Sequence, residues 1–190
     1  MRIIRDREIV DDGFVHVRDD EPLPASGDVI VSLVRWRADR EALLAREARV
    51  GVRCPGETEP DELAPDFAHW ALIALELPKF TDGRAYSTAR LLRERYGWQG
   101  ELRAVGDVLQ DQLFYLYRVG FDAFELKPGK SLESAVRAFE TFSVVYQPSV
   151  EQQLPLWRRR LRLARVEPRR AQEAESQEGR DGAARAQSRT

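Results

Sequence analysis

Short apolar runs alternate with helix-length segments along most of this chain. Apolar runs at Val29–Val31, Val50–Val52, Ala71–Leu75, Leu102–Val105 and Ala123–Leu126 are typical of buried strands. Between them, apolar residues recur every three or four positions, as on one face of an amphipathic helix. Strands that alternate with helices pair in parallel through right-handed crossovers. The pattern therefore predicts an α/β fold with an open, mostly parallel sheet of about five strands and helices on both faces.

The helix boundaries follow from capping residues and glycines. Ser32, Asp107 and Ser131 are residue types that cap helix N-termini, and Gly97 and Gly120 are typical helix stops. We expect helices at 32–47, 61–70 (interrupted at Pro65), 84–96, 107–119 and from 131 onward. The chain is too short for a complete eight-unit barrel, which takes about 250 residues, although a partial barrel arc would fit.

The two ends of the chain depart from this pattern. Alternating apolar residues flank Asp12 and Gly13, which is a strong signal for an N-terminal β-hairpin. The C-terminal residues are polar and lack aromatic side chains, so they cannot bury enough surface to become ordered. The predicted organisation is a hairpin in 1–20, an α/β domain in 28–147, a short basic helix in 148–166 and a disordered basic tail in 167–190.

The amino-acid composition limits the kinds of functional site that the chain can contain. No apolar run is long enough to cross a membrane, and no leader pattern is seen, so a cytoplasmic protein without a membrane contact is expected. Cys54 is the only cysteine, and His16 and His69 are the only histidines. No metal site is predicted, because so few cysteines and histidines exclude a His-rich or Cys-rich centre, although a carboxylate site for Mg²⁺ is not excluded. A reactive Cys54 would need a histidine beside it, and nothing in the sequence places one there.

Charge is unevenly distributed. Residues 155–190 carry ten arginines and five acidic residues, whereas the rest of the chain has 20 basic and 27 acidic residues. The Arg-rich segment would suit RNA, an acidic protein or a membrane surface. Because the acidic body would repel a nucleic acid, a solvated extension is the preferred interpretation, and nucleic-acid binding is the weakest of the functional alternatives.

Polar residues gather where two predicted strands end. Glu76–Arg84 follows one strand, and Arg103–Asp107 closes the next. Ligands of parallel sheets bind beyond the carboxyl ends of the strands, so a polar site is expected at this edge. The candidate ligand-binding residues are Lys79, Arg84, Arg103 and Gln112, and the candidate catalytic acids or bases are Asp82, Asp107 and Asp111.

A structural interpretation competes with the functional one for these residues. Asp82 precedes a glycine, as in a turn, and Asp107 would serve as a helix cap. Arg103 would then only neutralise a neighbouring carboxylate. If both belong to one helix, Asp107 and Asp111 are four positions apart and share a face. Both interpretations remain open from the sequence.

The segment Lys127–Ser131 contains Gly-Lys-Ser, the end of a phosphate-binding loop. That loop needs another glycine five residues before Gly129, where this chain has Phe124. The segment is therefore interpreted as a helix N-terminus and not as a nucleotide site.

Two runs of the sequence resemble a known bacterial family. Residues 77–93, which read LPKFTDGRAYSTARLLR, and residues 100–109, which read GELRAVGDVL, are similar to the signature of DUF934, a family of unknown function. So are residues 111–113 and 120–124. The similarity extends over about 28–147 and is strongest between Leu77 and Phe124.

What the resemblance implies is a cellular context. Members are commonly encoded beside genes for assimilatory sulfite and sulfate reduction, and no catalytic residue set comes with the family. This chain lacks a Cys-x-x-Cys pair, the cysteines of an iron–sulfur cluster and a dinucleotide fingerprint, and it shows no haem motif, so the cofactor is unknown. The first hypothesis is an accessory protein that contacts sulfite reductase, or another sulfur-assimilation enzyme, or binds a small anion. The second is a small enzyme with an anion site at the sheet edge, so whether the protein is an enzyme stays open.

Overall fold

The computed structural model describes residues 1–140 and 144–161. Residues 1–140 together with 149–151 form one compact unit, and residues 144–148 and 152–161 belong to a second. The expected disordered tail in 167–190 lies outside the described residues. So does most of the Arg-rich segment considered for nucleic-acid binding.

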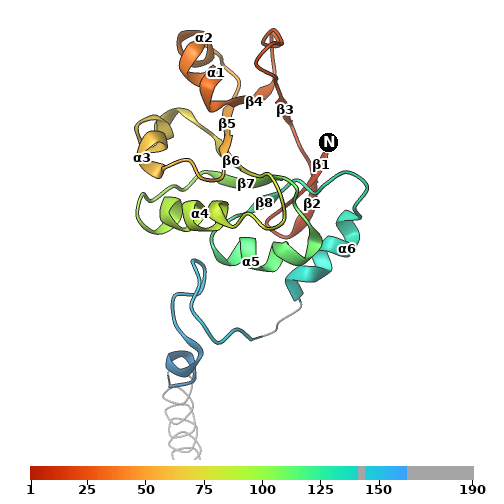
Figure 1. Ribbon diagram of the computed structural model, residues 1–190, viewed down its shortest axis with the longest axis vertical. Coiled ribbons are helices and arrows are strands. Elements are labelled where there is room, and N and C mark those ends of the chain that lie inside the picture. The colour runs from red at the N-terminus through yellow and green to blue at the C-terminus, as the bar shows by residue number, and fades with distance from the viewer. Residues whose placement is uncertain (141–143, 162–190) are drawn as a thin grey trace, which may run out of the picture. The chain divides into compact units, whose positions relative to one another are not determined.

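The first unit is built on one curled sheet of eight strands in the order β2-β1-β8-β7-β6-β5-β4-β3 (Figure 1). Strands β3 to β8 are parallel, and each pairs with the next in the chain. The antiparallel pair β1 and β2 is added beyond β8. The strands are β1 (Arg2–Arg5), β2 (Glu8–Asp11), β3 (Phe14–His16), β4 (Asp28–Ser32), β5 (Val50–Pro55), β6 (Leu72–Leu77), β7 (Glu101–Gly106) and β8 (Ala123–Phe124).

The connections are short helices. Ser32 and Ser131 cap α1 and α6 as predicted, because their hydroxyl oxygens accept hydrogen bonds from the backbone nitrogens of Arg35 and Ser134. The α-helices are α1 (Leu33–Ala38), α2 (Arg40–Leu44), α3 (Pro60–Leu63), α4 (Arg84–Glu94), α5 (Leu113–Arg118) and α6 (Leu132–Val136). The 3₁₀ helices are η1 (Ala64–His69), η2 (Gln110–Gln112) and η3 (Arg137–Glu140).

The mixed α/β class is confirmed, but the strand number and the placement of the helices were wrong. The sheet has eight strands, not five. The main hydrophobic cluster joins alternate strand residues to residues of α1, α4, α5 and α6, whereas the second cluster, on the other face, contains no helix residue. Parallel strands that follow one another in order with right-handed crossovers place every helix on the same face. The helices therefore cover one face only.

The curl of the sheet can be measured by one contact. A flat sheet would separate β3 from β8 by five strand spacings of about 4.8 Å, or about 24 Å. Instead, Nε2 of His16 on β3 lies 2.9 Å from Oε1 of Glu125, which follows β8. The sheet therefore bends far enough for the first and last parallel strands to meet, as in an arc of a barrel.

The hairpin predicted around Asp12 and Gly13 was wrong, although another hairpin forms within residues 1–20. The antiparallel partners are β1 and β2, and the turn is made by Asp6 and Arg7, which have φ of 51° and 69°. Such a two-residue turn needs positive φ at both positions. Asp12 and Gly13 instead lead from β2 to β3, which lies at the opposite edge of the sheet. The Asp12 side chain forms a buried ion pair with Arg103.

Two predicted helices are shorter than expected. The helix predicted over 32–47 is divided at Asp39 into α1 and α2. The helix predicted from Asp107 begins only with η2 at Gln110, so Asp107 is not its cap and does not share a helix face with Asp111. Asp107 is held instead by Lys127, whose Nζ lies 2.7 Å from its carboxylate.

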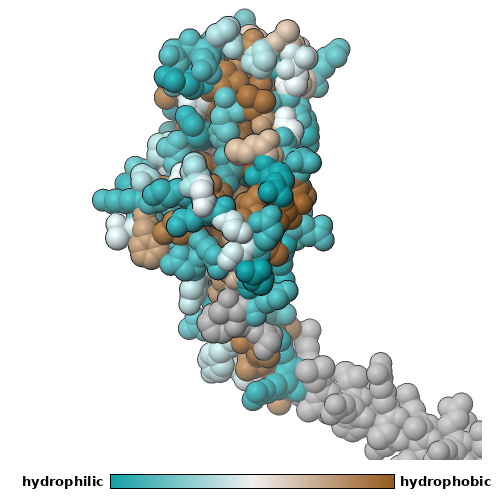
Figure 2. All heavy atoms as spheres, turned by 90° about the vertical axis from the view of Figure 1, so that its right-hand side faces the viewer, coloured by the Kyte–Doolittle hydropathy of each residue, from teal (hydrophilic) through white to brown (hydrophobic). Residues whose placement is uncertain are grey.

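The surface on the face shown in Figure 2 is mostly hydrophilic, with hydrophobic residues showing between the polar ones. Within the described residues, no helix is both long enough and apolar enough to cross a membrane. The second unit, taken by itself, contains a helical stretch over 156–161. There the backbone nitrogen of Leu156 donates to the carbonyl oxygen of Tyr146.

Candidate functional site

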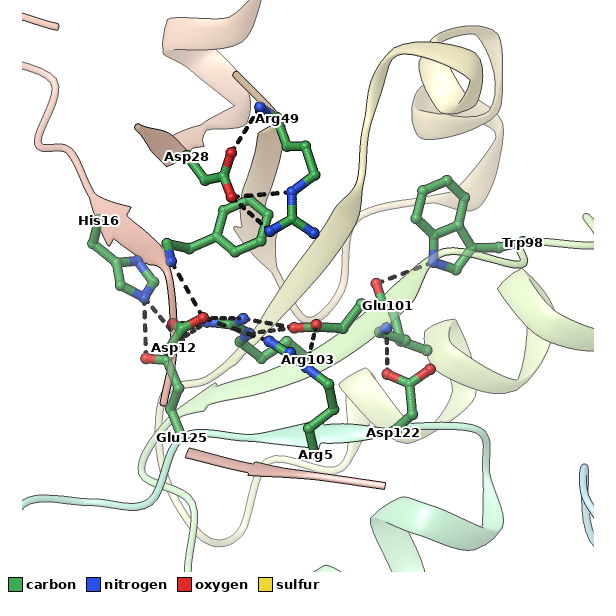
Figure 3. A network of polar contacts seen from close by, with 12 residues as sticks. Arg5, Asp12, His16, Asp28, Arg49, Trp98, Glu101, Arg103, Asp122 and Glu125 are labelled. Carbon is green, nitrogen blue, oxygen red and sulfur yellow. Dashed lines mark hydrogen bonds and ion pairs between the residues drawn. The ribbon is translucent and has the colours of Figure 1, made fainter. Parts of the chain in front are cut away.

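A fully buried arginine occupies the concave face of the sheet. Arg103 on β7 has no exposed side-chain surface, and its guanidinium lies at the centre of a ring of carboxylates (Figure 3). It donates to Asp12 at 2.7 Å, to Glu101 at 2.7 Å and to Glu125 at 2.8 Å. Arg5 on β1 adds a second guanidinium, 2.8 Å from Glu101. These side chains come from the N-terminal segment and from the β7 and β8 region, so the network ties the added β1–β2 pair to the parallel strands.

Apolar residues surround this network on the same face. Phe14 lies under Arg103, with the guanidinium carbon 5.6 Å from the ring centroid, and it also packs with Arg49. The rest of the concave face is covered by the apolar cluster of Phe14, Ile30, Leu72, Ala74 and Val105. The network is therefore enclosed, which strengthens its electrostatic interactions and makes an unpaired charge costly there.

The carboxylates of the network are held ionised. Burial alone would raise the pKa of Glu125, but hydrogen bonds and charge from His16 and Arg103 outweigh it, so this pKa lies below its usual value. Burial also raises the pKa of Asp12, but the hydrogen bond and charge of Arg103 outweigh it and bring this pKa below its usual value. Both groups are thus anionic at neutral pH, and the arginine is what keeps them so.

The network reaches the surface through Glu125 and His16. Nε2 of His16 lies 2.9 Å and 3.0 Å from the two oxygens of Glu125, and the opposite ring nitrogen, Nδ1, is buried and has no hydrogen-bond partner among the described residues. The side chain of His16 is 28% exposed, against 14% for Glu125. The pair therefore stands between the closed interior and the solvent.

A pocket of about 250 Å³ opens beside this pair. Its wall contains residues at or just beyond the carboxyl ends of five parallel strands, which is where barrel-like and open parallel sheets place their ligand sites. The lining residues are His16, Arg53, Glu76, Leu77, Pro78, Val105, Gly106 and Glu125. We refer to this cavity as the mouth pocket.

Two opposite charges face each other in the mouth pocket. Nε of Arg53 on β5 lies 3.1 Å from Oε1 of Glu76 on β6, and the two side chains are 37% and 40% exposed. Within the described residues this is the one ion pair that either side chain forms. Arginine presents five N–H donors in a planar fork that matches a carboxylate or an oxoanion. Arg53 is therefore the group in this pocket with donors left to bind a ligand.

The pocket wall also depends on a glycine. Gly106 has φ of +97°, and a Cβ at this position would lie 2.6 Å from the carbonyl oxygen of Leu77. The chain turns here so that the backbone nitrogen of Asp107 can donate to that same carbonyl at 2.7 Å. The close approach holds the ends of β6 and β7 together at the mouth.

The residues predicted at the sheet edge are only partly brought together. Asp82 and Arg84 form an ion pair at 2.6 Å at the start of α4, where Arg84 also contacts Glu57 at 3.0 Å. Hydrogen bonds from Arg84 hold the pKa of Asp82 at about 2. The backbone of Lys79 closes a turn with Asp82, and its side chain is exposed. An anionic Asp82 with that pKa is a poor proton donor at neutral pH.

The other predicted site residues are dispersed. Arg103 lies in the interior of the sheet and not at its edge, and its donors are taken by three carboxylates. Gln112 is buried, and its side-chain oxygen accepts from the backbone nitrogen of Leu109, which closes the turn of η2. Asp111 lines a separate, open cavity of about 530 Å³ with Phe114 and Tyr115.

None of the residues that line the mouth pocket was among the predicted site residues, and four of them are polar. His16, Arg53, Glu76 and Glu125 each lie on a strand or just beyond its carboxyl end. Arg53 and Glu76 interrupt runs of apolar residues at positions that alternation assigns to the concave face. That interruption was a usable signal. The pairing of His16 with Glu125 depends on the curl of the sheet and had no signal in the sequence.

Thiol and metal chemistry find little support in the described residues. Cys54 on β5 is buried, and burial raises the pKa of its thiol to about 12. Its thiol is therefore protonated and inaccessible at neutral pH. No group of three or more His, Cys, Asp or Glu side chains in residues 1–140 and 144–161 is arranged to hold a metal ion.

Comparison with known proteins gives one finding. The model of a family described as a bacterial protein of unknown function, DUF934, matches residues 51–157. This confirms the resemblance seen in the sequence. The match includes Arg53, Glu76, Arg103 and Glu125 and leaves out β1 to β4. No curated protein and no solved structure matches the chain.

Proposed function

Because the chain belongs to this bacterial family, DUF934, we propose that it is an accessory protein of assimilatory sulfite and sulfate reduction that binds a small anionic group in the mouth pocket. The link to sulfur assimilation comes from the family resemblance. The observation that supports ligand binding is Arg53, an arginine with unused donors at the carboxyl ends of parallel strands.

The position of Arg53 suits such a role. Its guanidinium is held by one ion pair to Glu76, and the Arg53 side chain is 37% exposed, so the anionic group of a ligand meets a charge that is already oriented. Bidentate binding by an arginine adds both energy and direction to the recognition of an oxoanion or a carboxylate. Arg103, the most buried cation of the sheet, stabilises the strands that carry the pocket and does not need to contact the ligand.

The cellular role is tested by deleting the gene and growing the strain on sulfate, sulfite or cysteine as the sole sulfur source. We expect growth to fail on sulfate and sulfite and to recover on cysteine. Complementation with Arg53→Gln should restore growth poorly. Complementation with Arg90→Gln, which removes an exposed ion pair on α4, should restore it fully. Normal growth of the deletion strain on all three sources, with no second gene to mask the loss, would contradict the sulfur role.

Action through a partner is tested separately. If the protein serves sulfite reductase by contact, the two should co-purify from cells grown on sulfate, and Arg53→Gln should leave that complex intact while it weakens ligand binding. Co-purification without any ligand would assign the role to the partner contact alone.

One observation favours an enzyme as the second candidate function. His16 is oriented by Glu125 within hydrogen-bonding distance and lines the mouth pocket, an arrangement that can transfer a proton to or from a bound ligand. An enzyme of this kind should lose turnover, and not ligand affinity, in the His16→Asn variant. Equal loss of affinity and turnover would limit His16 to binding.

A further inference from the structure

We propose that the ligand of the mouth pocket is a small α-amino acid, bound as a zwitterion alongside the Arg53–Glu76 ion pair. This inference rests on the ligand site of the proposed function and names the class of molecule that fits it. It follows from the charges on the pocket wall, their spacing and the size of the cavity.

The wall carries charges of both signs. Arg53 is the cation that lines the mouth pocket, and Glu76 and Glu125 are its carboxylates. Glu125 is already bonded to Arg103 and His16, so its charge is compensated from within the protein. Glu76 has no partner in residues 1–140 and 144–161 other than Arg53. Apart from His16, whose Nε2 already contacts Glu125, the polar groups left to meet a ligand are one guanidinium and one carboxylate.

A ligand of a single charge fits this wall poorly. A simple anion on Arg53 would lie beside Glu76 and would have to displace or repel it. A simple cation on Glu76 would meet Arg53 in the same way. A zwitterion avoids both costs, because its carboxylate accepts from the guanidinium while its ammonium donates to Glu76.

The spacing of the charges agrees with an α-amino acid. The Arg53 nitrogen and the Glu76 oxygen are 3.1 Å apart. The nitrogen and the nearer carboxylate oxygen of an α-amino acid are about 3 Å apart by covalent geometry. The two dipoles can therefore lie antiparallel, with each charge of the ligand opposite its counterpart on the protein. A molecule with widely separated charges could not do this.

The cavity limits the size of the side chain. Its volume of about 250 Å³ is below the range typical of drug-sized ligands, so it suits a metabolite of few heavy atoms. Leu77, Pro78 and Val105 provide an apolar part of the wall, where a short aliphatic, hydroxyl or thiol side chain could lie. Large aromatic or long basic amino acids are not expected to fit.

Calorimetric titration of the full chain tests the proposal directly. The probes are glycine, L-alanine, L-serine and L-cysteine, together with sulfate and sulfite as simple anions. L-alanine is compared with N-acetyl-L-alanine, which lacks the ammonium, and with L-alaninamide, which lacks the carboxylate. We expect at least one of the amino acids to bind, and we expect both blocked forms of alanine to bind at least tenfold more weakly than alanine itself.

The protein variants match the blocked ligands. Arg53→Gln should weaken binding of the amino acid at least tenfold, and Glu76→Gln should have the same effect. Arg53→Gln removes the group that binds the ligand's carboxylate. The variant should therefore show a smaller difference in affinity between alanine and alaninamide. Arg90→Gln and Glu94→Gln, which break an exposed pair outside the pocket, serve as controls and should bind normally. Circular dichroism and urea unfolding establish that each variant is folded.

The outcomes separate this inference from the proposed function. Binding of sulfate or sulfite with no binding of any amino acid would overturn the zwitterion inference and keep an anion-binding accessory protein. Binding of an amino acid together with normal growth of the deletion strain would keep the inference and remove the sulfur role. If none of the four amino acids binds the folded protein, the inference is wrong.

Discussion

At the scale of single residues, Arg103 has the largest structural consequence. Its guanidinium forms hydrogen bonds to Asp12, Glu101 and Glu125 in a region with almost no solvent. Removing one partner of a buried ion pair leaves the others uncompensated and costs about 3–5 kcal/mol. We expect Arg103→Ala to lower the free energy of unfolding by about that amount, as measured by urea titration. Arg84→Ala removes an exposed arginine and should leave the urea midpoint nearly unchanged. Equal effects of the two variants would contradict a central role for Arg103.

The same network predicts how stability depends on pH. The pKa of Asp12 in the folded protein is below its ordinary value of 3.8, because the hydrogen bond and charge of Arg103 outweigh the opposing effect of burial. A depressed pKa adds stability above the unfolded value, and this stability is lost as the pH falls through the folded value. Asp12→Asn should therefore be less stable than the wild type at pH 7, with a difference that narrows as the pH is lowered below about 4. A difference that is constant with pH would show that Asp12 contributes by shape and not by charge.

Cys54 gives a residue-scale test of the sheet interior. Burial raises the pKa of its thiol to about 12, and the side chain is 1% exposed. A thiol reagent at pH 8 should therefore leave the native protein unmodified and label one cysteine per chain in urea. Rapid labelling of the native protein would mean that β5 opens locally far more often than its burial implies.

At the scale of elements, the close packing of the carboxyl ends of β6 and β7 depends on one backbone position. Gly106 has φ of +97°, and a Cβ there would contact the carbonyl oxygen of Leu77. Gly106→Ala should cost about 1–3 kcal/mol, because it adds both strain and a close contact with backbone. Gly83→Ala is the matched control, since Gly83 has negative φ and open space around it. Urea unfolding compares the two, and comparable losses would argue against the strain.

The elements also show which parts of the fold could be predicted from the sequence and why other parts could not be predicted. The apolar runs at Val50–Val52 and Ala71–Leu75 correspond to β5 and β6, and the caps at Ser32 and Ser131 are confirmed, because each depends on local chemistry. The turn at Asp6–Arg7 lacks the glycine that usually marks positive φ, so the hairpin was placed wrongly.

The candidate site was harder to predict from the sequence than the fold. Its location at the carboxyl ends of the strands follows a general rule of parallel sheets. Its composition depends on which side chains point to the concave face and on how far the sheet curls. The contact of His16 with Glu125 spans 109 positions in the chain and is created by that curl alone.

At the scale of the whole molecule, the N-terminal segment completes the sheet at both edges. Strands β1 and β2 extend one edge beyond β8, and β3 forms the other beside β4. Between these strands, Asp12 supplies a buried partner to Arg103. The segment also covers the apolar interior, because Ile3 and Ile4 are fully buried and Phe14 nearly so. It is therefore part of the core and not an appendage to an α/β domain that starts at residue 28.

This arrangement predicts the result of a truncation. A chain that starts at Asp28 retains β4 to β8 and all the helices, but it exposes the concave face and leaves Arg103 without Asp12. Exposure of apolar surface and loss of a buried ion-pair partner both lower the free energy of unfolding. We expect the truncated chain to lose cooperative urea unfolding and to bind a hydrophobic dye. A truncated chain that unfolds cooperatively at the wild-type midpoint would mean that the arc from β4 to β8 is stable by itself. The ion-pair network would then serve the mouth pocket and not the fold.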